Sequence, residues 1–140
     1  MAKNQGGNPF EDSREAVLRF ETVVEPTFRN QGFRRLDGRS QILINDTTKS
    51  IVFVTSAPSQ GKLIGYYKDK LKKFKKELEG YSPYLLFTRD SQDWNDKPTY
   101  VNIMKKTMNI SGFKGVVSGL DKLPRMIGKV KENSQCYLID

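Results

Sequence analysis

Cations are the residues of this sequence whose number and spacing most clearly suggest chemistry. The chain carries 24 Lys and Arg against 16 Asp and Glu, a formal net charge of +8. The excess is uneven, since residues 62–79 hold seven lysines and three acids, whereas residues 97–115 hold four lysines and no acid. Several cations must reach one phosphate backbone to displace its counterions, so clustering matters more than the total. The uneven charge therefore predicts a basic face that binds nucleic acid.

Three separate stretches supply the cations of this predicted face. The first precedes a predicted hairpin, the second lies in a lysine-rich helix, and the third lies in a later helix. A run of charges on an amphipathic helix is also explained as solvated surface with local acidic partners, so the hypothesis requires the three stretches to meet in space. The predicted nucleic-acid-binding residues are Arg34, Arg35, Arg39, Lys68, Lys72, Lys73, Lys76, Lys105 and Lys106.

Acidic side chains suggest a second chemistry, because Mg²⁺ prefers carboxylate oxygens and can promote phosphoryl transfer. Asp37 and Asp46 lie near the predicted hairpin and are the candidate magnesium ligands and catalytic residues, with Glu15 or Glu21 from the first helix. Both aspartates also suit turns, and Glu15 suits a helix-capping position. The sequence leaves open whether the protein is an enzyme. If it is one, we expect a magnesium-dependent nuclease, and otherwise no cofactor is predicted.

Other residue types narrow the functional classes. Histidine is absent, which removes the commonest general base and the commonest zinc ligand. Cys136 is the single cysteine, so no internal disulfide can form and a cytoplasmic, intracellular setting is expected. The apolar runs are much shorter than the roughly 20 residues that a membrane span requires, and we expect no membrane partner.

A first helix must position the candidate glutamates. Apolar residues repeat at helical spacing between positions 17 and 28, which predicts a helix that starts at Asp12 or Ser13. Gly32 should end this helix. Pro26 should kink it or end its regular part, because proline lacks the backbone N–H that a helix interior needs.

A hairpin and a βαβ unit should follow. Residues 40–44 and 50–55 are β-branched and apolar on either side of a turn-like stretch, which predicts two antiparallel strands. The lysine-rich residues 62–79 repeat apolar side chains at helical spacing and should form a helix capped by Gly80, with one side on the core and lysines on the other. The continuous apolar run at 84–88 is typical of a strand buried on both faces.

The last third of the chain predicts another helix, a strand and a final helix. Pro98 suits a first helical turn, and that helix should end near Gly112. Residues 114–118 should form a short strand, and Asp121 should cap the final helix.

These elements predict one α/β domain. Their order, α-β-β-α-β-α-β-α, indicates a mixed β-sheet of about four or five strands flanked by helices. A chain of 140 residues is long enough for a single core. We expect residues 13–140 to form that domain behind a flexible tail at residues 1–12, which lack any periodicity.

This order of elements resembles the core of the restriction-endonuclease-like nucleases over roughly residues 13–130. That family usually places an Asp at the start of the second hairpin strand and a Glu or Asp, one residue, then Lys on the next strand. Here Gln41 and Val54–Ser56 occupy the corresponding places. The resemblance therefore implies a nuclease-like fold without its standard metal site. The residues that carry it are Gly32, Phe33, Gln41–Ile44, Ile51–Val54, Tyr66, Tyr67, Gly115–Val117, Leu120 and Leu123.

The sequence is compatible with three functions. The first is a basic nucleic-acid-binding domain, for DNA or RNA, that contacts the phosphate backbone. The second is a divergent magnesium-dependent endonuclease. The third is a protein-interaction module whose basic face meets an acidic protein partner, and a homodimer is compatible with each.

Overall fold

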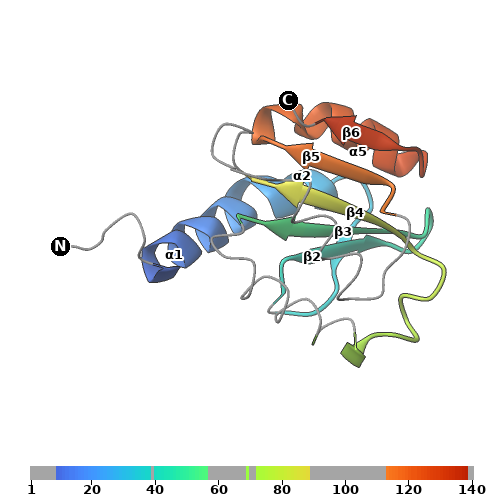
Figure 1. The fold of residues 1–140 in the computed structure, drawn as a ribbon, viewed down its shortest axis with the longest axis horizontal. Helices are drawn as coiled ribbons and strands as arrows, with labels where there is room; N and C mark the ends of the chain where they lie inside the picture. The colour runs from blue at the N-terminus through green and yellow to red at the C-terminus, as the bar shows by residue number, and fades with distance from the viewer. Residues whose placement is uncertain (1–8, 39, 57–68, 70–71, 89–112, 139–140) are drawn as a thin grey trace.

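The computed structural model describes residues 9–38, 40–56, 69, 72–88 and 113–138. Within these residues a six-stranded mixed sheet forms the centre of the molecule (Figure 1). The strands lie side by side in chain order, antiparallel from β1 to β3 and parallel from β3 to β6. The predicted α/β class and mixed sheet are therefore confirmed. The strands are β1 (Arg34–Arg35), β2 (Ile42–Asn45), β3 (Ser50–Thr55), β4 (Ser82–Phe87), β5 (Gly115–Ser118) and β6 (Cys136–Leu138).

The sheet has more strands than the four or five expected, because two short edge strands join it. β1 contributes two residues and β6 contributes three. Strands of this length show no readable alternation of apolar and polar residues, so the sequence pattern does not reveal them. Their pairing with β2 and β5 defines them instead.

The first helical segment is interrupted where proline was expected to disturb it. α1 (Pro9–Arg19) runs into the π-helical turn η2 (Phe20–Val24), and α2 (Glu25–Arg29) follows. The backbone N–H of Glu25 bonds the carbonyl of Phe20, five residues back. Pro26 stands at the start of α2, where its missing N–H costs least. The regular α-helix is therefore interrupted just before Pro26, and the helix begins at Pro9 rather than at Asp12 or Ser13.

The π-helical turn also changes which residues of the first segment face the core. Phe20, Val24 and Phe28 are fully buried, as their spacing predicts. Val17, expected on the same stripe, is 43% exposed, and Ala16 is buried in its place. The wider turn contains one extra residue, so the buried face of α1 is offset by one position.

The hairpin and the first parallel pair match the prediction. β2 pairs with β3 in antiparallel register, with Ile44 opposite Ile51. β4 pairs with β3 in parallel register, with Phe87 opposite Thr55. All six residues of β3 are buried, as expected of a central strand covered on both faces.

Two apolar cores pack on opposite faces of this sheet. One contains Phe20 and Phe28 from the first helical segment, Met126 from α5, and Tyr84 from the sheet. The other contains Phe53 and Phe87, and three partly buried residues pack against it: Phe74 and Leu78 of the lysine-rich segment, and Tyr81 just after it. Phe74 and Leu78 confirm the predicted apolar side of that segment, but residues 74–80 form turns rather than the helix that was expected up to Gly80.

The end of the described chain covers the sheet with a helix and adds β6. The 3₁₀ turn η4 (Leu120–Lys122) leads into α5 (Leu123–Lys131). Asp121 lies within the 3₁₀ turn, and no side-chain cap bonds the start of α5, so the predicted capping role is wrong. The helix predicted from Pro98 to Gly112 lies outside the described residues. Among the helices that the structure describes, none is long and apolar enough to cross a membrane.

The parallel strands give the sheet two distinct edges. Their amino ends gather near the β2–β3 turn at residues 46–49 and near Tyr81, whose neighbour Ser82 donates its N–H to the carbonyl of Lys49. Their carboxyl ends gather near Thr55, Phe87 and Ser118. We call these the amino edge and the carboxyl edge.

Candidate nucleic-acid interface

Asp46, a predicted magnesium ligand, belongs to a small polar cluster at the amino edge. Arg34 donates from Nε to its Oδ2 at 2.9 Å, and the Tyr81 hydroxyl donates to its Oδ1 at 2.6 Å. These hydrogen bonds, the one from Arg34 above all, lower the pKa of Asp46. The carboxylate therefore links β1, the β2–β3 turn and the residue before β4.

Asp37, the other predicted ligand, lies at the carboxyl edge. Its Oδ1 accepts the backbone N–H of Ser40 at 2.6 Å and the Ser40 hydroxyl at 2.7 Å, which closes the β1–β2 turn. Ser40 and Asp46 stand beyond opposite ends of β2. Six residues of extended chain span about 20 Å, while a magnesium–oxygen bond is about 2 Å long. The predicted joint site of Asp37 and Asp46 is therefore excluded by their separation.

The predicted glutamates do not complete either site. Glu21 forms an ion pair with Arg35, with 3.8 Å between Oε2 of the glutamate and Nη1 of the arginine, and Glu15 is exposed on α1. In the described part of the chain, no three acidic or cysteine side chains gather closely enough to hold a metal ion. The carboxylates are accounted for here by ion pairing, turn closure and solvent exposure.

The two places that the nuclease resemblance singles out do lie together. The backbone N–H of Val54 donates to the carbonyl of Gln41 at 3.0 Å, so the start of β2 adjoins the end of β3. Thr55 and Ser56 follow, and both are buried. This corner of the carboxyl edge offers amide and hydroxyl groups, which are poorer ligands for Mg²⁺ than carboxylates.

The lysine-rich segment at residues 72–80 presents the densest positive charge that the structure describes. Lys72, Lys73, Lys75 and Lys76 are all exposed, while Phe74 and Leu78 hold the segment on the core. Lys73 also lies 5.2 Å from the ring of Phe74. Gly80 ends the segment with φ +85°, a conformation that glycine adopts without strain. The predicted arrangement of a core side and a lysine side is present here.

Lys49 brings a further cation to this segment from a distant part of the sequence. Its ammonium group lies 5.2 Å from the ring of Tyr81, and the backbone of Tyr81 bonds the carbonyl of Leu78. Lys49 sits in the tight β2–β3 turn with φ +58°. The sequence prediction missed Lys49 and Lys75. The proximity of Lys49 to the lysine-rich segment follows from the register of the parallel pairing of β3 with β4, which the sequence does not specify. We call Lys49, Lys72, Lys73, Lys75 and Lys76 the lysine surface.

The arginines of β1 divide between the two faces of the sheet. Arg34 bonds Asp46 beside Tyr81, and the charge of Glu77 also contributes to its raised pKa, so it lies near the lysine surface. Arg35 turns the other way. Its guanidinium lies 5.1 Å from the ring of Phe20 and donates to the carbonyl of Ser40. The other predicted cations, Arg39, Lys68, Lys105 and Lys106, lie outside the described residues.

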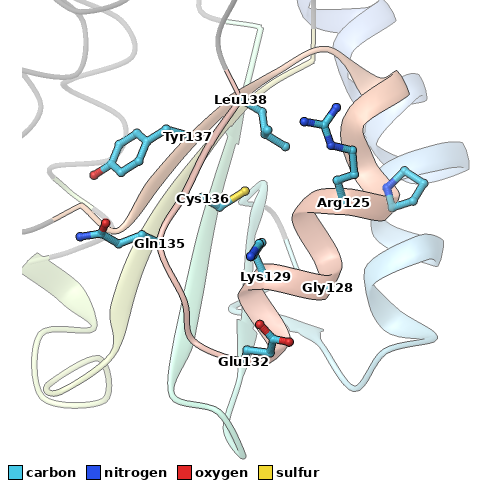
Figure 2. A pocket seen from close by; sticks show the side chains of 9 residues that line it. Arg125, Gly128, Lys129, Glu132, Gln135, Cys136, Tyr137 and Leu138 are labelled. Carbon is cyan, nitrogen blue, oxygen red and sulfur yellow. The ribbon is translucent and has the colours of Figure 1, made fainter.

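A second basic region, which the sequence prediction missed, borders a groove between α5 and β6 (Figure 2). The groove has a volume of about 540 Å³. Arg125, Gly128 and Lys129 form its wall on α5, and Cys136 and Leu138 line it from β6. The spacing of Arg125 and Lys129 by four residues was a readable signal for one helix face. Without β6, however, that signal predicts no groove.

Charge in this groove is mixed. Burial raises the pKa of the Cys136 thiol, and the nearby charges of Lys129 and Arg125 offset only part of that rise. Glu132 closes one end and accepts a hydrogen bond from the hydroxyl of Ser134 at 3.3 Å. The thiol therefore stays protonated at neutral pH and behaves as an apolar floor.

Comparison of the chain with protein-family models, with curated protein sequences and with solved structures gives no significant match.

Proposed function

We propose that this protein binds nucleic acid through the lysine surface, contacting the phosphate backbone rather than the bases. The observation that carries the proposal is the meeting of two stretches: four exposed lysines at residues 72–76, and Lys49 seated against Tyr81 at the end of the same segment. Ammonium groups on flexible stems suit the spaced phosphates of a polyanion. Such contacts position a nucleic acid without reading its sequence.

The distribution of ion pairs supports this use of the lysines. The ion pairs of the described residues join Arg29 to Glu25, Arg34 to Asp46, and Arg35 to Glu21. None of them includes a member of the lysine surface. Glu77 and Glu79 lie in the same segment but are outnumbered. Lys49 lies near enough to Asp46 to lower the pKa of that carboxyl, but a lysine that is not held in a direct ion pair leaves more of its charge for an external anion.

We further propose that the fold is nuclease-like but lacks a standard metal site. The adjacency of Gln41 to the end of β3 supports this reading, since carboxylates would occupy those places in an active member. A magnesium-dependent nuclease has no comparable support, because Asp37 and Asp46 stand at opposite edges of the sheet. Binding without cleavage is therefore the function that we propose.

The direct test is the salt dependence of oligonucleotide binding. A fluorescein-labelled mixed-sequence oligonucleotide, single-stranded or duplex, is titrated with the protein and followed by fluorescence polarisation. If about five phosphates are contacted, affinity should fall by about 500-fold between about 50 and 200 mM monovalent salt. Affinity that is unchanged across this range would contradict the proposal.

A charge-reversal pair locates the interface. Lys72→Glu with Lys76→Glu should reduce the salt slope by about two units and weaken binding at every sequence tested, because two phosphate contacts are lost. Both side chains are exposed, so the fold should persist by circular dichroism. The matched control, Arg125→Glu with Lys129→Glu, changes the net charge equally on α5. Equal loss of binding in both proteins would show that net charge alone, and not the lysine surface, is responsible.

A further inference from the structure

The helix α5 and the strand β6, which frame the groove, lie at the opposite side of the molecule from the lysine-rich residues 72–80 (Figure 1). Figure 2 shows Cys136 and Leu138 directed toward α5, while Tyr137 points away from it. On the helix, Arg125, Gly128 and Lys129 line the same wall. An apolar floor beside two cations fits a ligand that carries both apolar contacts and negative charge.

The strand that lines the groove has a free backbone edge in the described chain. β6 is the last strand of the sheet order, and its inner side pairs with β5, where Cys136 donates its N–H to the carbonyl of Lys114 at 3.0 Å. Alternation along a strand directs the N–H and C=O of Tyr137 outward. Natural edge strands are commonly guarded by charge, proline or a bulge. The residues Cys136–Leu138 include no charge and no proline.

We propose that β6 and α5 form a docking site for an acidic extended peptide of a partner protein, which adds as a strand beside β6. The peptide backbone bonds the outward N–H and C=O of Tyr137, as in other complexes formed by strand addition. Its side chains alternate in direction, so every second residue faces α5. Acidic residues at those positions meet Arg125 and Lys129, and small apolar groups cover Leu138.

The groove suits a peptide better than a nucleic acid. A phosphate backbone offers acceptors only, whereas the edge of β6 presents both a donor and an acceptor that another strand satisfies together. Glu132 at the end of the groove repels a continuous polyanion but tolerates a peptide with spaced charges. This site is independent of the lysine surface, and each can fail without the other.

The probe for the test is a fluorescein-labelled peptide in which glutamate alternates with valine, so that all its acids lie on one face when extended. Polarisation should show saturable binding to the full-length protein. A peptide with lysine in place of glutamate should not bind, because it meets Arg125 and Lys129 with like charge. A glutamate–valine peptide with a central proline should bind at least about tenfold more weakly, because proline removes a backbone donor.

Two kinds of variant separate charge from shape. Arg125→Glu with Lys129→Glu should weaken the peptide complex by about tenfold or more, through loss of two charged contacts. Gly128→Phe should weaken it comparably without any change in charge, because space beside Gly128 is open and a large ring fills the groove. Gly128→Ala is the matched control and should bind nearly as wild type. The lysine-surface pair Lys72→Glu with Lys76→Glu should bind the peptide almost normally.

Three results would overturn the proposal. The first is absence of saturable peptide binding up to about 1 mM, near the weak limit of specific recognition. The second is wild-type peptide affinity in the Arg125 and Lys129 double variant. The third is loss of oligonucleotide binding, with peptide binding intact, in that same variant. The third result would assign the groove to nucleic acid instead.

Discussion

The two basic surfaces of this protein are built in different ways. The lysine surface consists of exposed side chains, most of them on a segment whose described residues Phe74 and Leu78 pack on the core. The groove is framed by a helix and a strand that several buried contacts hold together. Tyr84, fully buried, donates its hydroxyl to the carbonyl of Ser134 just before β6, and Lys114 bonds Asn133 just after α5.

The lysine surface therefore depends mainly on charge for recognition, whereas the groove depends mainly on shape. Lysines on flexible stems retain their function when the backbone beneath them shifts slightly, but they are sensitive to salt. A groove depends on the spacing of two elements, so it is sensitive to packing. Changes in the core should therefore disturb peptide binding first, and changes in ionic strength should disturb oligonucleotide binding first.

The largest effect is expected from Gly115→Ala, which disturbs the packing of β5 against β6 and so the position of the strand that lines the groove. A Cβ at this position would stand 2.3 Å from the carbonyl oxygen of Cys136 and 2.9 Å from Cδ2 of Tyr84. Because a backbone atom cannot yield without moving β6, the variant should lose about 3 kcal/mol of unfolding free energy. Urea unfolding followed by circular dichroism measures this loss.

The same substitution elsewhere on the groove is the control. A Cβ at Gly128 would meet no atom within 4 Å, and the residue lies in α5. Gly128→Ala should therefore leave the free energy of unfolding unchanged or raise it by up to about 1 kcal/mol. Folded Gly115→Ala protein should lose peptide affinity and keep its oligonucleotide affinity. Equal stability of the two variants would show that β6 is not packed as closely on β5 as described.

The next effect is a loss of stability at high pH, caused by Tyr84. Burial raises the pKa of this hydroxyl to about 12, against about 10 for an ordinary tyrosine. Between these values the unfolded chain has lost the proton that the folded chain keeps, so raising the pH favours unfolding. Tyr84 should remove about 2 to 3 kcal/mol of stability as the pH rises from about 9.5 to 12.

Tyr84→Phe isolates this contribution from that of the lysines, which also titrate at high pH. Near pH 8 the variant should be about 1 kcal/mol less stable than wild type, since it lacks the bond to Ser134. Above about pH 11 the order should reverse, because only the wild type must ionise a buried phenol. Parallel urea curves at several pH values test this, and a constant difference between the proteins would contradict it.

The smallest effect is expected from Asp46→Asn, which changes the polar cluster of Arg34, Asp46 and Tyr81 beside the lysine surface. Arg34 and Asp46 are both about half exposed, with side-chain exposures of 54% and 53%, so loss of the charge pair should cost under about 1 kcal/mol. Because the ion pair lowers the pKa of Asp46, the stability it contributes is present at neutral pH. That stability is lost as the pH falls through the folded pKa.

Binding should change in the opposite direction. Removing one negative charge beside Lys49 and Arg34 should tighten oligonucleotide binding about two- to threefold at low salt and leave peptide binding unchanged. Fluorescence polarisation with both probes measures this. Weaker oligonucleotide binding in Asp46→Asn would mean that the carboxylate itself takes part in the interface.

Much of the fold was predictable because its central elements have clear periodicity. The continuous apolar run at residues 84–88 predicted a strand buried on both faces, which is β4, and Phe20, Val24 and Phe28 predicted the buried face of the first helical segment. The exposure of Val17 was not predictable, since a π-helical turn leaves no pattern in the sequence. β6 was missed because three residues are too short to show alternation.

The candidate sites were less predictable because they depend on which strands are neighbours. The lysines at residues 72–76 can be recognised in the sequence because they lie close together. Lys49 comes near them only through the pairing of β3 with β4. Asp37 and Asp46 are nine positions apart in the sequence, yet β2 separates them in space. Arg125 and Lys129 border a groove only because β6 returns beside α5.

The π-helical turn at Phe20–Val24 has a consequence for how this protein tolerates insertions and deletions. It holds one residue more than regular α-helical winding needs. Removal of a single residue there would restore that winding without rotating α1, because the deletion and the loss of the wide turn cancel. Ala16 would still face the core, and Val17 would stay exposed. The first helical segment should therefore tolerate the loss of one codon within Phe20–Val24, provided that the deleted residue is not one of the buried pair, Phe20 and Val24.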